Sequence, residues 1–181
     1  MSLVETIREI RTIGDGYPVY QHAQVSIKEV RPEEVWPISK YVLTATLLFI
    51  DEVRNEFLRR GIDIFKLDDI VQTNEVVIAP PLVEYDGNTD CIVDGIHRIY
   101  SAKEKGKRIT VLYVSGADRP IIGKPIDWNR VQKVDILPAD PKARRDLREG
   151  IEDTSECLRR HYRDLSILGS KGRRPSHGQA A

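Results

Sequence analysis

Hydrophobic and polar residues recur along the chain with two different periods, which predicts a mixture of helices and strands. Apolar positions three to four residues apart predict a short helix over residues 3–13. Alternating apolar and polar positions over residues 19–30 predict a strand that ends before Pro32. From about residue 40 the pattern becomes amphipathic and predicts the main core helix, with Gly61 at its C-terminal end.

A hairpin, a helix and a third strand are predicted for the middle of the chain. The stretch VVIAPPLVEY, residues 76–85, reads as a strand with an irregular entry at its two prolines, and Asp86-Gly87 is typical of a hairpin turn. Cys91–Val93 is then the second arm of the hairpin. A helix over about residues 97–105 and a strand over Ile109–Val114 follow. This order predicts a small α/β fold of the α+β type, with a mixed sheet packed with helices.

The chain divides into four parts, with one domain expected from a length of 181 residues. These parts are an N-terminal helical extension (1–16), a central domain (17–137), a C-terminal helix (138–168) and a disordered tail (169–181). The central domain includes a strand-like segment at Val131–Ile136. The C-terminal helix is predicted from Asp140 through about Leu165, rich in charged residues and interrupted at Gly150.

Composition excludes several classes of partner and compartment. The 28 basic and 28 acidic residues balance, so no overall field draws the protein to nucleic acid or to a membrane. Cys91 and Cys157 lack the spacing of a disulfide framework or a zinc site. No apolar run is long enough to span a bilayer, and residues 1–16 do not resemble a signal peptide, so we expect a cytoplasmic protein without a membrane partner.

The junction IVDGIHR, where a strand meets a helix, is the candidate site. Asp94-Gly95 brings a carboxylate next to the free backbone amides of a first helical turn, and glycine lets another group approach the backbone closely. His97 and Arg98 place cations at the wrong end of the helix dipole, which an anion such as phosphate would offset. The alternative is structural: Asp94 as a helix cap, His97 as a packing residue and Arg98 as a surface ion-pair partner.

This junction, with its hairpin, helix, glycine and apolar strand, resembles the ParB/sulfiredoxin superfamily over about residues 19–116. The resemblance implies a ParB/sulfiredoxin-like nucleotide-binding domain over 17–137, whose loop holds nucleotide phosphates through the Gly95–Ile96 amides, His97 and Arg98. Sulfiredoxins carry a catalytic cysteine immediately before the histidine, and Ile96 stands there in this chain. Chromosome-partitioning ParB proteins have a G-E-R-R-like loop and a following DNA-binding domain, so they match less well.

The free-serine kinase branch of the superfamily is closest in motif. Its Lys-Pro-x-Glu turn resembles Arg31-Pro32-Glu33-Glu34, so the resemblance implies catalytic roles for Glu34 and Asp94. It implies phosphate transfer from ATP or ADP to a small hydroxyl compound such as free serine, with CTP as a further possible nucleotide and Mg²⁺ bound by Asp94. Ser101, one turn after His97, is a further candidate phosphate ligand. We expect Glu34 and Asp94 to face each other across a cleft within about 10 Å.

A non-catalytic alternative stays open: a nucleotide-binding or DNA-associated regulatory ParB-like module. The C-terminal patterns KARRDLR and LRRHYR are basic and contain an aromatic residue, which is compatible with DNA contact. Because acidic residues are interspersed, a solvated or interface helix is the favoured interpretation. The sequence leaves the oligomeric state open.

Overall fold

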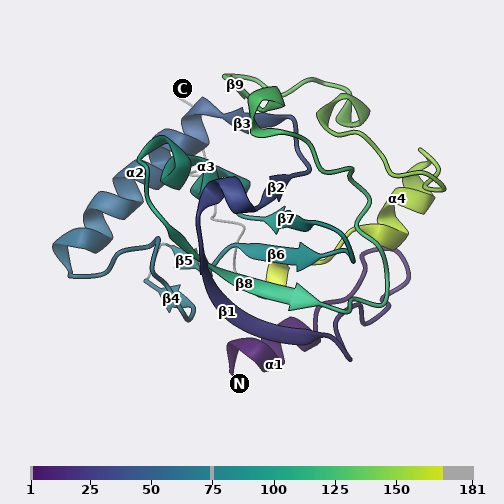
Figure 1. Ribbon diagram of the computed structural model, residues 1–181, viewed down its shortest axis with the longest axis horizontal. Helices are drawn as coiled ribbons and strands as arrows, with labels where there is room; N and C mark the ends of the chain where they lie inside the picture. The colour runs from purple at the N-terminus through teal and green to yellow at the C-terminus, as the bar shows by residue number, and fades with distance from the viewer. Residues whose placement is uncertain (1, 74–75, 169–181) are drawn as a thin grey trace, which may run out of the picture.

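A five-stranded mixed sheet forms the centre of the protein (Figure 1). The structure is a computed structural model that describes residues 2–73 and 76–168. The strands lie in the order β1-β8-β6-β7-β2, and their bounds are β1 Gln24–Val30, β2 Trp36–Pro37, β6 Leu82–Tyr85, β7 Asp90–Asp94 and β8 Ile109–Ser115. The β1–β8 and β6–β7 pairs are antiparallel, whereas β8–β6 and β7–β2 are parallel.

Two short strand pairs and several helices surround this sheet. One pair is β3 (Tyr41–Leu43) with β9 (Gln132–Val134), and the other is β4 (Val71–Gln72) with β5 (Val77–Ile78). The helices are α1 Leu3–Arg8, α2 Thr44–Arg59, α3 Ile96–Glu104 and α4 Ser155–His161. Short 3₁₀ turns are η1 Pro32–Glu34, η2 Trp128–Arg130, η3 Pro141–Arg144 and η4 Ser166–Leu168.

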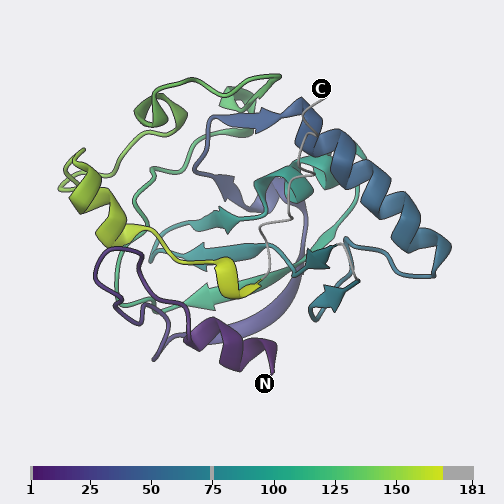
Figure 2. The ribbon, with the colours of Figure 1, turned by 180° about the vertical axis from the view of Figure 1, so that it is seen from behind.

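Both faces of the sheet are covered, by different parts of the chain. On one face, Val83 and Ile92 pack in a core with side chains of α2 and α3, including Phe57 and Ile99. On the other face, Leu82, Leu112 and Val114 pack with the α1 residues Leu3 and Ile7 and with Leu168 of η4. Seen from behind, α1 and η4 lie in front of the strands (Figure 2). The first and last described segments therefore close the same face of the sheet.

The predicted α+β class is confirmed, and so are the hairpin and the helix and strand that follow it. The strand predicted over residues 76–85 is divided at its two prolines into β5, which pairs with β4, and β6 of the central sheet. The hairpin is β6–β7, its entry is irregular at Pro80-Pro81, and the helix that follows is α3. Gly106, just after α3, has φ +60°, as a glycine that ends a helix requires. The core helix α2 begins at Thr44, later than predicted, because Tyr41–Leu43 pairs with β9 instead.

The two ends of the chain differ from the sequence-based expectations. The first helix ends at Arg8, and its apolar side chains belong to the core rather than to an appendage. For the helix predicted from Asp140 through about Leu165, the interruption at Gly150 is confirmed and the helical length is wrong. Only η3 and α4 are helical there, because Gly150 interrupts the segment at φ +79° and Thr154 caps a new helix at Ser155. The tail predicted to be disordered, 169–181, lies outside the described residues.

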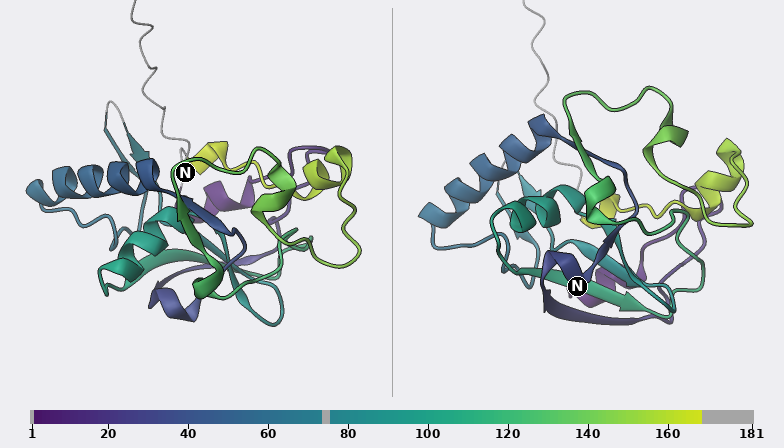
Figure 3. Two further views of the ribbon diagram at one scale, coloured as in Figure 1. Left: turned by 90° about the horizontal axis from the view of Figure 1, so that it is seen from above. Right: turned by 45° about the horizontal axis from the view of Figure 1, so that its top comes forward.

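The long helix α2 and the short helix α4 lie at opposite ends of the molecule (Figure 3).

Within the described ranges, none of the helices combines the length and the apolar composition that a membrane span requires.

Candidate functional site

The turn at Gly95 connects the end of β7 to the start of α3 and depends on glycine. Its φ of +81° lies in the left-handed region. A Cβ at this position would lie 2.7 Å from the Pro81 Cβ and 2.9 Å from Nη2 of Arg98. The amides of Ile96 and His97 have no hydrogen-bond acceptor among residues 2–73 and 76–168. The turn therefore leaves two backbone donors available at the positive end of the helix dipole.

Arg98 lies beside these amides and is held in place by its neighbours. Its Nη1 donates to the backbone carbonyl of Ala79, and its Nη2 lies 3.9 Å from Oδ2 of Asp94. The side chain is 11% exposed, and burial lowers the pKa of the guanidinium while the Asp94 carboxylate opposes that shift. Because a guanidinium has five N–H donors, Arg98 retains donors for an anion at the helix start.

His97 lies on the side of α3 that faces β3. Its Nε2 accepts a hydrogen bond of 3.0 Å from the backbone N–H of Leu43. This bond requires a lone pair on Nε2, so the proton of the neutral ring is on Nδ1. Burial lowers the pKa of His97, partly opposed by Asp94. His97 is therefore a neutral donor through Nδ1, and not the cation that the sequence suggested.

His97 should make stability depend on pH in mildly acidic solution. Its folded pKa is lowered, so the unfolded chain takes up a proton first, and stability falls as pH drops below about 6.5. His97→Gln keeps an acceptor for the Leu43 amide and cannot be protonated. We expect the stability advantage of the wild type over this variant to shrink between pH 7.5 and 5.5 in urea unfolding. Identical pH profiles would contradict the assignment.

Ser101 lies one turn further along α3 but points toward α2. It is buried at 1% exposure, and its hydroxyl donates to Oδ1 of Asp51 at 3.1 Å. The Lys105 ammonium donates to the same hydroxyl at 3.3 Å and forms an ion pair of 2.8 Å with Asp51. Ser101 thus contributes to the contact between α2 and α3, and its proposed phosphate contact stays a prediction.

Glu34 lies at the opposite end of β7 from Asp94. The parallel pairing of Trp36 with Cys91 means that the chain enters β2 beside the start of β7, whereas Asp94 is the last residue of β7. In agreement, the neighbouring Glu33 lies 4.0 Å from Lys103 in the last turn of α3. The expected separation of Glu34 and Asp94 within about 10 Å stays a prediction. The strand before Glu34, β1, is at the far edge of the sheet, with β8 and β6 between it and β7.

The surroundings of Glu34 are local and exposed. Its carboxylate accepts from the backbone N–H of Arg31 at 2.8 Å and from the Arg31 Nε at 2.9 Å, and the side chain is 45% exposed. These hydrogen bonds lower the pKa of Glu34. A general base at neutral pH works best with a raised pKa, so this environment suits a turn-capping residue better than a base.

Asp94 is the acidic side chain next to the helix start, and it is 26% exposed. Among the described residues, no group of three or more His, Cys, Asp or Glu side chains is arranged to hold a metal ion. Magnesium is commonly bound by one or two carboxylates together with substrate phosphates. Asp94 therefore fits a metal that arrives with a nucleotide, but not a metal site built by the protein alone.

A comparison with protein families decides the relationship of the chain. The family model of the ParB CE domain matches residues 2–132, from α1 to the first residue of β9. The chain belongs to the ParB CE domain family. No curated protein and no solved structure matched it.

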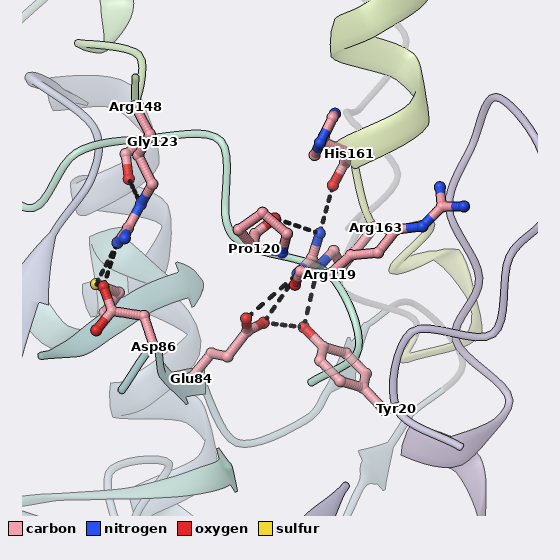
Figure 4. Close-up of polar contacts among 10 residues, drawn as sticks. Tyr20, Glu84, Asp86, Arg119, Pro120, Gly123, Arg148, His161 and Arg163 are labelled. Atoms are coloured by element: carbon pink, nitrogen blue, oxygen red, sulfur yellow. Dashed lines mark hydrogen bonds and ion pairs between the residues drawn. The ribbon is translucent and has the colours of Figure 1, made fainter. Parts of the chain in front are cut away.

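A buried polar cluster joins the segment matched by the family model to residues that follow it (Figure 4). The sequence did not predict this cluster. Glu84 of β6 is 1% exposed, and Nη2 of Arg163 lies 3.2 and 3.3 Å from its two carboxylate oxygens. The Tyr20 hydroxyl donates to the same carboxylate at 2.6 Å and accepts from Nε of Arg163. The other Arg163 bonds go to three backbone carbonyls, those of Arg119, Pro120 and His161.

These contacts join four parts of the ParB-family chain that are distant in sequence. Burial raises the pKa of Glu84, and the hydrogen bonds from Arg163 and Tyr20 oppose that rise. A second ion pair, between Arg148 and Asp86, connects the segment around Arg148 to the turn between β6 and β7 (Figure 4). An acidic residue within the apolar run LVEY signals a buried carboxylate, but no pattern identifies its partner beyond residue 132.

Proposed function

We propose that this ParB-family protein binds a nucleotide through its phosphates at the start of α3. The observation that supports the proposal is the Gly95 turn, where two backbone amides without acceptors lie beside a largely buried arginine. Backbone donors, the helix dipole and a guanidinium together favour an anion more than any of them alone.

Each residue of the turn has a role in this proposal. Phosphate oxygens accept from the amides of Ile96 and His97, from the remaining donors of Arg98 and from Nδ1–H of His97. Gly95 allows the close approach. A Mg²⁺ ion arriving with the nucleotide binds Asp94, and its charge offsets that of the phosphates. The candidate nucleotides are ATP, ADP and CTP.

Binding without phosphate transfer by Glu34 agrees best with the geometry. Transfer to the hydroxyl of free serine needs a base near the phosphates, whereas Glu34 lies in the turn that enters β2 beside the start of β7, and Asp94 lies at the end of β7. Its lowered pKa also disfavours that role. We therefore propose a nucleotide-binding module, in which the nucleotide regulates the protein rather than being consumed at Glu34.

DNA contact by the C-terminal segment is not part of the proposal. Several of the arginines considered for it are bonded within the fold: Arg144 donates to the Pro138 carbonyl, and Arg148 and Arg163 form ion pairs with Asp86 and Glu84. A charge already paired in this way releases few counterions on meeting DNA.

Calorimetry with ATP, ADP, CTP and GTP, each with and without Mg²⁺, tests the proposal. We expect one of these nucleotides to bind, and Arg98→Ala to weaken its binding by about 10- to 100-fold, as the loss of a hydrogen bond to a charged group predicts. Asp94→Asn should weaken binding with Mg²⁺ more than without it. Glu34→Gln and the exposed Arg108→Ala are matched controls that should leave the affinity unchanged.

Two outcomes would contradict the proposal. One is the absence of binding for all four nucleotides and for inorganic pyrophosphate, which needs only the phosphate site. The other is unchanged affinity in an Arg98→Ala protein whose folded state has been verified by circular dichroism. Reduced affinity in Glu34→Gln would instead return Glu34 to the site.

A further inference from the structure

A pocket of about 170 Å³ opens on the face of the sheet opposite α3. Val93 of β7 lines it, and Val93 points away from the α2–α3 core because side chains alternate along a strand and Ile92 belongs to that core. Ile38, Ile121 and Ile122 add further apolar wall. The polar side chains come from beyond the family match: Arg145, His161 at the end of α4, and Tyr162 and Arg163 just after it.

Arg145 is the unusual member of this lining. Its Nε is buried and has no hydrogen-bond partner among the described residues, and no carboxylate of residues 2–73 or 76–168 forms an ion pair with it. The neighbouring Arg163 and Arg148 are paired with Glu84 and Asp86. Arg145 therefore brings one uncompensated positive charge to the pocket.

Stacking explains only part of the environment of Arg145. Its guanidinium carbon lies 5.1 Å from the centre of the Tyr162 ring, a cation–π distance. Such stacking involves the face of the guanidinium and leaves the buried Nε–H without an acceptor among the described residues. A buried donor without an acceptor is destabilising, so an acceptor that reaches the Nε–H would be stabilising.

We propose that this pocket binds a small monocarboxylate with a short, branched apolar body. The carboxylate accepts hydrogen bonds from the guanidinium edge of Arg145, and the body packs on Ile38, Val93 and Ile121. The volume of about 170 Å³ is well above the roughly 10–15 Å³ that one water needs by this measure, so the pocket has room for a compound of several non-hydrogen atoms. A phosphate dianion fits less well, because its second charge would be placed against isoleucine side chains without a partner.

The proposed site is independent of the nucleotide site. The two lie on opposite faces of β7, and Arg145 has no part in the α3 turn. A failure of nucleotide binding therefore leaves this proposal standing, and the reverse is also true.

Nuclear magnetic resonance of the full chain provides the test, because the side-chain Nε–H of Arg145 gives its own signal. The probe is sodium isovalerate, compared at constant ionic strength with the neutral isovaleramide and with sodium phosphate. We expect isovalerate to shift the Arg145 Nε–H signal and the amide signals of Val93 and Ile122 with one saturable curve. Isovaleramide and phosphate should bind at least tenfold more weakly.

Arg145→Met should weaken isovalerate binding at least tenfold, whereas Arg160→Met is a matched control that should not change it. Arg160 is 55% exposed and pairs with Glu156 on the surface of α4. The comparison of acid with amide in the wild type needs no variant, so it decides the question even if Arg145→Met fails to fold. Equal binding of acid and amide, tighter binding of phosphate, or no saturable shift would overturn the proposal.

Discussion

Arg163→Met is expected to lower the free energy of unfolding by about 3–5 kcal/mol, the range for removing one partner of a buried ion pair. The substitution leaves the Glu84 carboxylate at 1% exposure with only Tyr20 as a side-chain partner. It also leaves the carbonyls of Arg119, Pro120 and His161 without this donor. Urea unfolding followed by circular dichroism measures the loss.

The charge of Glu84 is what makes this substitution costly, and two comparisons test that explanation. Without Arg163 the pKa of Glu84 should rise further, so the folded protein takes up a proton first and the loss of stability should be smaller at pH 5 than at pH 7. The control Arg160→Met, at an exposed ion pair, should change stability by about 0.5 kcal/mol or less. An equally small effect of Arg163→Met would show that the buried pair contributes little.

Gly95→Val is the second substitution with a large expected effect, a loss of about 2–6 kcal/mol. A β-branched residue at φ +81° costs about 1–3 kcal/mol in backbone strain. A Cβ at 2.7 Å from the Pro81 Cβ forces a shift of packed backbone and adds about 1–3 kcal/mol. Both effects act at the turn that carries the proposed phosphate site.

Gly106→Val separates these two contributions. Gly106 has φ +60°, and a Cβ there would meet no atom within 4 Å, so only the backbone strain applies. The difference between the two variants in urea unfolding measures the close approach of Pro81. Equal losses would mean that the contact with Pro81 is easily relieved.

The sequence predicted the elements whose pattern is complete within one segment. In the hairpin, α3 and β8, the apolar residues show the spacing of their element within a single segment. Gly106, in the left-handed conformation, ends α3. The segment after residue 137 was predicted only in part: the break at Gly150 was expected, whereas the pairing of its arginines with distant carboxylates was not. Such long-range partners leave no local pattern.

The candidate site was likewise predicted only where its residues are close together in the sequence. Asp94, Gly95 and Arg98 lie within five consecutive residues, and the structure places them together at one turn. The position of Glu34 relative to Asp94 depends on the order of the strands in the sheet, which sequence motifs do not specify. The two-residue strand β2 is too short to give an alternating pattern, yet its parallel pairing with β7 determines where Glu34 lies.

The pairing of Glu84 with Arg163 also bears on the order in which the protein can fold during translation. The two residues are 79 positions apart, so at about 5–20 residues per second the ribosome adds Arg163 about 4–16 s after Glu84. Once β8 has been made, the nascent chain contains all of the sheet strands but still lacks the arginine that neutralises the buried carboxylate. A chaperone that recognises exposed apolar surface would therefore meet this protein while the apolar residues of α1 and of one sheet face are still uncovered. Binding of the chaperone should end only once the segment that contains Arg163 and η4 has left the ribosome and packed on that face.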